Sequence, residues 1–187
     1  MSEINLDHRT AVVTRSAKAE VIGEQPKATM LLADFDATGG KLSTNRTWLG
    51  PGDGGPPPHY HSRSSELFFI VGGALEVLTG DRVTTLTEGD LLVVPPYMPH
   101  AWKAPADQPA DVLIVFTPGI ERFEYFRMVG RLFKGEATEE ELFAAEERYD
   151  NHWVDNEVWK QYLEDPAAYA AAQAAHDGHD GCEACGS

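Results

Sequence analysis

Turn-forming residues divide the middle of the chain into short segments, and this pattern limits the fold more than any other feature. From residue 65 to 117 the divisions fall at Gly72-Gly73, Gly80-Asp81, Glu88-Gly89 and Pro95-Pro96. Many short strands separated by regular turns indicate a β-sandwich or a β-barrel. We therefore expect strands over residues 66–71, 74–79, 82–87, 90–95, 98–103 and 111–117.

Further strands are expected before this region, and a stiff loop separates them from it. Residues 28–35 have the composition of a strand buried on both faces, residues 42–49 alternate loosely, and residues 10–15 are a further strand candidate. Residues 50–58 contain four glycines and four prolines, which excludes a helix or a central strand. We expect this loop to lead directly into His59.

Three histidines and one glutamate lie in or beside the predicted strands. Because side chains alternate along a strand, His59 and His61 point to the same face. Glu66 begins the next strand after a short polar turn, and His100 comes from a later hairpin that a closed barrel would bring towards the others. Imidazole nitrogens and a carboxylate suit Fe, Mn, Co, Ni or Zn, and ligand type alone does not choose between them.

A lone His-x-His motif is common by chance, and single histidines usually lie on the surface or accept a hydrogen bond in the core. The spacing here is more specific, because His59-x-His61 and Glu66 precede Gly73, while Gly89 and Pro95 precede His100. This order resembles the two sequence signatures of the cupins over about a hundred residues. The chain departs from those signatures at Asp53, Tyr97 and Ala104, and the ligand positions are intact.

The resemblance implies a mainly β fold, the cupin double-stranded β-helix or jelly-roll barrel, over residues 1–118. A helical extension over residues 119–175 would pack on the barrel, followed by a flexible tail over 176–187. His59, His61, Glu66 and His100 would bind one divalent transition metal, and Glu66 would also act in catalysis. The resemblance also implies a homodimer and a small-molecule substrate.

The hydrophobic period changes to a helical one after residue 119. Phe123, Phe126 and Val129 recur at helical spacing, and Thr138 with Glu141 has the pattern of a capping box before a helix that runs to about 149. Further helices are expected over 155–163 and from Pro166 onwards. An aromatic stripe on such helices usually packs on a core, and a lid over a substrate is the alternative.

The tail repeats metal-binding residue types every three positions, at His176, His179, Cys182 and Cys185. This spacing allows a Zn, Ni or Co chelate. The intervening glycines and the terminal position favour a flexible segment instead, so we do not count these residues as a site.

Composition excludes several classes of partner. The 187 residues contain 15 Lys and Arg against 30 Asp and Glu, and the net charge of −15 argues against nucleic acid or an anionic membrane. No segment reaches the roughly 18 apolar residues that a spanning helix needs. The first residues lack the pattern of a secretory signal, and the only two cysteines lie in the tail. These features predict a soluble cytoplasmic protein.

Within the cupins, the local pattern is most similar to the single-domain quercetinase-like group. The matching pieces are Thr38-Gly39-Gly40, the Gly/Pro-rich loop, and Pro118-Gly119 followed by residues 120–123. The resemblance implies a metal-dependent dioxygenase of a small aromatic or enolic, flavonol-like substrate, with Glu66 as both ligand and general base. The aromatic residues that could line its pocket, or simply pack in the core, are Trp48, Tyr60, Phe68, Trp102 and Phe116.

Two other classes of function stay open at this stage. One is a non-oxidative isomerase, lyase or cyclase that uses the metal as a Lewis acid, and the other is a small-molecule-binding cupin without catalysis. One fold can host all three, so the resemblance alone does not choose between them.

Overall fold

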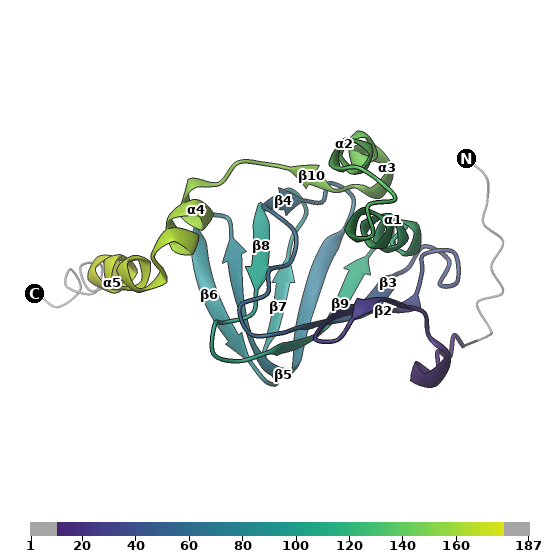
Figure 1. Ribbon diagram of the computed structural model, residues 1–187, viewed down its shortest axis with the longest axis horizontal. Helices are drawn as coiled ribbons and strands as arrows, with labels where there is room; N and C mark the ends of the chain where they lie inside the picture. The colour runs from purple at the N-terminus through teal and green to yellow at the C-terminus, as the bar shows by residue number, and fades with distance from the viewer. Residues whose placement is uncertain (1–10, 178–187) are drawn as a thin grey trace, which may run out of the picture.

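The computed structural model of the protein describes residues 11–177 and consists mainly of antiparallel β-strands followed by helices (Figure 1). Every strand pair in the described residues is antiparallel. The strands are β1 (Val21–Glu24), β2 (Lys27–Ala33), β3 (Ser43–Leu49), β4 (His59–Tyr60), β5 (Ser65–Thr79), β6 (Arg82–Thr87), β7 (Leu91–Val94), β8 (His100–Lys103), β9 (Ala110–Thr117) and β10 (His152–Trp153).

The strands form two layers that share β5. The first half of β5 pairs with β9 and β7, which gives one layer the order β1-β2-β3-β9-β5-β7. The second half pairs with β6 and β8, and the other layer has the order β6-β5-β8-β4-β10. Figure 1 shows the two layers joined at the bend of β5, with β4 and β8 at the opposite end.

The predicted turn at Gly72-Gly73 is wrong, because β5 continues through both glycines as one bent strand. The pairing with β9 shifts register between Ile70 and Gly72, as at a β-bulge. Gly73 has a φ of 72°, and a Cβ atom there would lie 1.9 Å from the carbonyl oxygen of Pro109. Only glycine tolerates both conditions, so a bend forms where the sequence pattern alone indicates a reversal of the chain.

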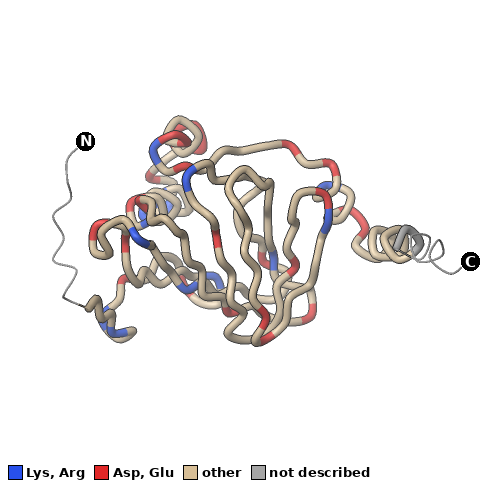
Figure 2. The backbone as a smooth tube through the Cα atoms, turned by 180° about the vertical axis from the view of Figure 1, so that it is seen from behind, with Lys and Arg blue, Asp and Glu red and all other residues tan. Residues whose placement is uncertain are grey.

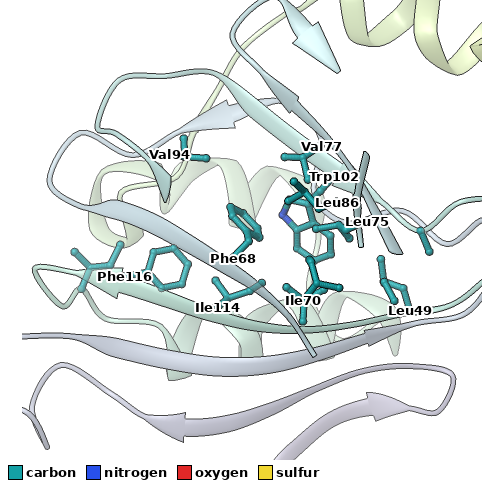
Figure 3. Packing of buried hydrophobic residues seen from close by; sticks show 14 residues of the cluster. Leu49, Phe68, Ile70, Leu75, Val77, Leu86, Val94, Trp102, Ile114 and Phe116 are labelled. Atoms are coloured by element: carbon teal, nitrogen blue, oxygen red, sulfur yellow. The ribbon is translucent and has the colours of Figure 1, made fainter. Parts of the chain in front are cut away.

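The core lies between the two layers and consists of alternating side chains from both. Phe68, Ile70, Ile114 and Phe116 come from one layer, and Trp102 comes from the other. Figure 3 shows these side chains packed against one another between the strands. Of the aromatic pocket candidates, Phe68, Trp102 and Phe116 are therefore core residues.

The helices follow the barrel in the chain, as the change of hydrophobic period predicts. They are α1 (Phe123–Phe133), α2 (Glu139–Ala144), α3 (Glu146–Tyr149), α4 (Glu157–Glu164) and α5 (Pro166–Asp177). Thr138 forms the predicted capping box with Glu141. The single helix expected over 138–149 is divided at Ala145 into α2 and α3.

The helices pack in two places (Figure 1). Tyr125, Leu142 and Tyr149 form one cluster among α1, α2 and α3. Trp159 and Tyr162 of α4 pack on Leu78 and Ala101, on the outer side of the second layer. The aromatic stripe on α4 therefore serves core packing, which is the commoner of the two interpretations.

Some expectations are wrong at the ends of the chain or fall outside the described residues. No strand forms over residues 11–15, and the first strand begins at Val21. His179, Cys182 and Cys185 lie outside the described residues, as does the side chain of His176. Metal binding by the tail therefore stays a prediction.

Charged residues lie mainly on loops and helices, while the strands are largely uncharged (Figure 2). Across residues 11–177, no helix combines the length and apolar character needed to cross a bilayer. The cytoplasmic location stays a prediction.

Candidate metal centre

The four predicted ligands come together inside the barrel. Pairing of β4 with β8 places His59 opposite His100, while Glu66 begins β5 and His61 lies in the loop between β4 and β5. One nitrogen or oxygen atom of each residue lies within 4.8 Å of those of the others. Each of the four residues is at most 3% exposed. The sequence prediction that these residues converge is therefore confirmed.

Backbone carbonyl groups set the protonation of all three imidazoles. His59 Nδ1 lies 2.9 Å from the carbonyl oxygen of Pro57, His100 Nδ1 lies 2.9 Å from that of Met98, and His61 Nδ1 contacts that of Asp150. A carbonyl oxygen only accepts, so each Nδ1 carries the proton. In a neutral ring Nε2 then keeps a free lone pair, which is the form that binds a metal.

The contacts of Glu66 test whether a cation fits this set. Its Oε2 lies 3.1 Å from His61 Nε2 and 2.7 Å from His100 Nε2. With the single proton of each neutral ring on Nδ1, these Nε2 lone pairs face an anionic oxygen. A cation shared by the three atoms would turn this repulsion into attraction. Bonds of about 2.1 Å span about 4 Å across an ion, so the four residues need only small adjustments to hold one.

The electrostatics favour neutral rings at His59 and His61 and an ionised carboxylate at Glu66. Burial lowers the pKa of His59 well below its usual value, and the neighbouring His100 and His61 act in the same direction. Burial, followed by the positive charge of Arg122, lowers the pKa of His61. Burial opposes ionisation of Glu66, but protons on the Nε2 atoms of His100 and His61 would donate to its carboxylate and hold its pKa well below the usual range, and a metal ion in their place would act in the same direction. These protonation states are those of metal ligands.

Asp150 supports the centre from the C-terminal side, and sequence reasoning did not single it out. Its side chain is fully buried, and its φ of 54° lies in the left-handed region. The carboxylate accepts hydrogen bonds from the backbone N–H groups of Ser62 and Arg63, and from the Ser62 hydroxyl. An Asp after a helical segment is a known signal for this backbone conformation, but its partners are not visible in the sequence.

Residues after the barrel also cover the centre. β10 pairs with β4, which sets Trp153 opposite His59, and the two rings lie 5.5 Å apart. Figure 1 shows the segment from α3 through β10 to α4 crossing the end of the barrel where β4 and β8 lie. Arg122 approaches His61 from the start of α1. The sequence assigned no role to Arg122 or Trp153, because their contacts join segments far apart in the chain.

The departures from the cupin signatures have local explanations. Tyr97, where the family usually has glycine, adopts a φ of 65°, and its N–H group bonds the His61 carbonyl oxygen at 2.8 Å. Ala104 is fully buried and bonds the carbonyl oxygen of Asp53 through its N–H group. Neither departure displaces a proposed ligand.

The two described cavities lie away from this centre. One, of about 470 Å³, is lined by residues of α1, α2 and α3 with the segment between α1 and α2. The other, of about 430 Å³, lies between β2 and the start of α1 and has several acidic groups. Neither is lined by any of the four proposed ligands.

Comparison with known proteins agrees with this geometry. Residues 46–116 match the family model described as Cupin domain, and this range contains all four proposed ligands. Residues 46–116 are therefore similar to a cupin domain. Two cupin structures share the fold of this chain. Each is 19% identical to it in sequence, and an identity this low supports the fold alone. An RmlC-like cupin from Shewanella frigidimarina aligns with a TM-score of 0.50 over 62% of this chain and 96% of that protein. A predicted oxalate decarboxylase from Thermotoga maritima aligns with a TM-score of 0.50 over 56% of this chain and 97% of that protein.

The chain also resembles germin-like proteins of Oryza sativa subsp. japonica. Identity is 38% over 102 residues with germin-like protein 9-2, and this match covers 50% of the chain and 47% of the relative. For germin-like protein 9-3 it is 37% over 95 residues, or 48% of the chain and 44% of the relative. The chain thus spans a little under half the length of these relatives. The jelly-roll expectation is confirmed, while the quercetinase-like subgroup stays a prediction.

Proposed function

We propose that the protein is a metal-dependent cupin enzyme that acts on a small aromatic or enolic substrate with adjacent oxygen atoms. The observation that carries this proposal is the buried set of three imidazoles and one carboxylate, in which each Nδ1 is bonded to a backbone carbonyl group. The other interior residues of the barrel are largely apolar. A polar set of this kind within an apolar interior favours a ligand-binding or catalytic centre.

The four residues would hold one divalent transition metal, with Fe, Mn, Co, Ni and Zn all compatible with the donor set. Such an ion supplies Lewis acidity, which lowers the pKa of a coordinated hydroxyl group. Phe116 packs edge-on against His61, with ring centres 5.3 Å apart, and helps to exclude water.

The proposed role of Glu66 as general base is the weaker part of its assignment. A base works best when its pKa lies near the operating pH, whereas hydrogen bonds hold the pKa of Glu66 well below the usual range against the effect of burial. This low pKa favours Glu66 as a metal ligand. A base role would require its carboxylate to reach the substrate hydroxyl group.

Dioxygenation of a flavonol-like substrate is the first candidate reaction, on the basis of the similarity to the quercetinase-like group. A non-oxidative isomerase, lyase or cyclase reaction is the second. The donor set supports it as well, because a bound divalent ion would act as a Lewis acid with or without dioxygen. A binding protein without catalysis is the third outcome.

One experiment separates the three. The purified protein is analysed for metal and then mixed with flavonols, catechols and other small enols, under air and under nitrogen. Dioxygen uptake with substrate loss only under air supports the dioxygenase, and equal turnover under nitrogen supports the non-oxidative enzyme. Binding without turnover of any substrate would refute an enzymatic function. Absence of bound metal after loading would refute the whole proposal.

We also propose that two copies associate through the outer face of the first layer. Four exposed apolar side chains, Phe69 and Val71 of β5 and Leu91 and Val93 of β7, lie on neighbouring strands there. In the described part of the chain β7 pairs only with β5, so it forms an edge of its layer. An apolar patch on an edge strand favours association with another chain.

A further inference from the structure

Arg122 is not among the four proposed metal ligands, yet its guanidinium lies against them. Its Nη2 atom lies 3.1 Å from His61 Nε2, the nitrogen that would bind the metal. The residue is only 2% exposed and lies just before α1. The guanidinium therefore belongs to the surroundings of the centre.

The hydrogen-bond acceptors of this cation are neutral, while the carboxylates of Glu66, Asp150 and Asp34 attract it from farther away. Nη1 donates to the carbonyl oxygen of Tyr149 and to Oδ1 of Asn151, and Nη2 donates to the same Oδ1. The guanidinium carbon lies 4.1 Å from the centre of the Phe116 ring. Within residues 11–177, no carboxylate accepts a hydrogen bond from the guanidinium. Because Arg keeps its proton in proteins, it is a buried cation without a direct anionic partner.

Unpartnered donors lie around the same place. Arg122 Nε, Asn151 Nδ2 and Trp153 Nε1 are buried and have no hydrogen-bond partner in the described part of the chain. Asn151 is bonded to Arg122, and Trp153 packs on His59, so each donor belongs to a side chain at or next to the centre. A buried donor without an acceptor costs about 1–3 kcal/mol. A bound molecule that supplies acceptor atoms would satisfy these three donors together.

The chemistry of these groups indicates which kind of molecule this is. The guanidinium of Arg122 lies 3.1 Å from a proposed metal ligand, and the three unpartnered atoms around it are all N–H donors. A divalent ion held by the four ligands would place two further positive charges beside that guanidinium. Positive charges repel strongly in a site shielded from water. An anionic ligand relieves this repulsion, and a neutral ligand does not.

We infer that Arg122 is a substrate-binding residue and that the centre selects a substrate presenting an oxyanion, a carboxylate or an enolate, to the metal and the guanidinium together. The inference rests on the proposed function, since it requires a metal held by the four ligands. Asn151 is a positioning residue, because its Oδ1 holds both terminal nitrogens of the guanidinium. Charge-assisted hydrogen bonds of this kind are about twice as strong as neutral ones.

The test compares an anion with a neutral molecule of the same shape. The full chain is loaded with Co²⁺ and titrated with acetate and with acetamide, and the visible absorption of Co²⁺ reports binding. We expect wild type to bind acetate at least about tenfold more tightly than acetamide. In Arg122→Gln this preference should fall clearly, towards the preference that the Co²⁺ ion alone provides, while Co²⁺ content stays unchanged.

A second variant keeps the arginine in place. Asn151→Asp sets a carboxylate of the same shape on the guanidinium, whose nitrogens lie 3.0 and 3.1 Å from Oδ1. The new charge neutralises the cation, so this variant should also lose the preference for acetate. Arg148→Gln is the matched control, because Arg148 is an exposed residue paired with Glu121, and it should keep the preference.

The outcomes separate the two proposals. If Arg122 acts only in packing, Arg122→Gln changes the affinities for acetate and acetamide equally. In that case Asn151→Asp leaves the preference for acetate intact. Either result overturns the inference. If Arg122→Gln does not fold, Asn151→Asp alone decides. A wild-type protein that takes up no Co²⁺ refutes the proposed function and this inference with it. Loaded wild type and variants with equal preference refute the inference alone.

Discussion

The Nδ1 atom of His61 donates its proton to the backbone carbonyl oxygen of Asp150, 89 positions later in the chain. The Asp150 carboxylate accepts hydrogen bonds from the backbone N–H groups of Ser62 and Arg63. The main chain and the side chain of Asp150 therefore both bind the loop between β4 and β5. A candidate metal ligand on the barrel thus depends on a residue of the C-terminal extension for its tautomer and its orientation. The extension contributes to the centre as well as to the packing of the barrel.

Replacing a proposed ligand should remove the metal. We expect His61→Ala and Glu66→Ala each to abolish stoichiometric metal binding, because each removes one of four converging donors. Elemental analysis of the purified variants measures this. Glu88→Ala is the control, since Glu88 is exposed in the turn between β6 and β7 and does not belong to the donor set. If Glu66→Ala keeps both metal and activity, the assignment of Glu66 is wrong.

Asp150→Asn should destabilise the protein in a pH-dependent way. Burial alone would raise the pKa of Asp150, but hydrogen bonds from Ser62 and Arg63 lower it from 3.8 to about 2. Because the folded pKa lies below the unfolded one, the carboxylate stabilises the fold above pH 3.8, and this contribution disappears as the pH falls towards 2. We expect Asp150→Asn to lower the free energy of unfolding by about 2 kcal/mol at pH 7.

Urea unfolding of the metal-free protein at several pH values measures this difference. Wild type and Asp150→Asn should differ by a constant amount above pH 5 and converge below about pH 3. Asp155→Asn is the control, because the Asp155 side chain is 92% exposed, and it should change stability little at any pH. A difference that is independent of pH down to the acid limit would contradict the proposed role of the charge.

Gly73→Ala should destabilise the barrel strongly. An added Cβ would lie 1.9 Å from the Pro109 carbonyl oxygen, and the φ of 72° is unfavourable for alanine. Gly80→Ala is matched to it, because Gly80 has a similar φ of 65° and no atom within 4 Å of the added Cβ. We expect Gly80→Ala to lower the free energy of unfolding by about 1–2 kcal/mol, from the backbone alone. Gly73→Ala should lower it by clearly more, and thermal unfolding measures both losses. Equal losses would mean that Pro109 moves aside freely.

Charges on the outer face of the first layer should separate the proposed dimer. We expect Leu91→Lys together with Val93→Lys to give a monomer, because both side chains are more than half exposed on an edge strand. Light scattering during gel filtration measures the mass. Phe133→Lys is the control, since Phe133 is also exposed but lies on α1, and this variant should behave as wild type. A wild-type protein that is already monomeric would disprove the dimer.

The strands of the barrel and the identity of the candidate ligands could be predicted from local patterns. Alternation and turn residues indicated β6 over 82–87 and placed β9 within one residue of its observed start. The spacing of His59, His61, Glu66 and His100 was sufficient to group them before any coordinates. These features depend on neighbours within a few residues along the chain or on a motif of fixed spacing.

Other features escaped prediction because long-range contacts decide them. Gly72-Gly73 has the composition of a turn, and only the approach of Pro109 explains a bend within one strand. The short strand β10 has no pattern of its own and exists because β4 offers it a partner. Arg122 and Asp150 look like ordinary charged residues in the sequence, and their burial against His61 follows from the packing of the helices.

The sequence by itself determined most of the strand segments between residues 65 and 117 and the four side chains available to a metal, because both follow from residue type and spacing. Only the tertiary structure decided how those side chains are protonated and what charge surrounds them. Those properties depend on the carbonyl group of Asp150 and the guanidinium of Arg122, which reach His61 from 89 and 61 positions away in the chain. Hydrogen bonding and electrostatic attraction act through space, and a linear pattern carries no information about which distant groups they join.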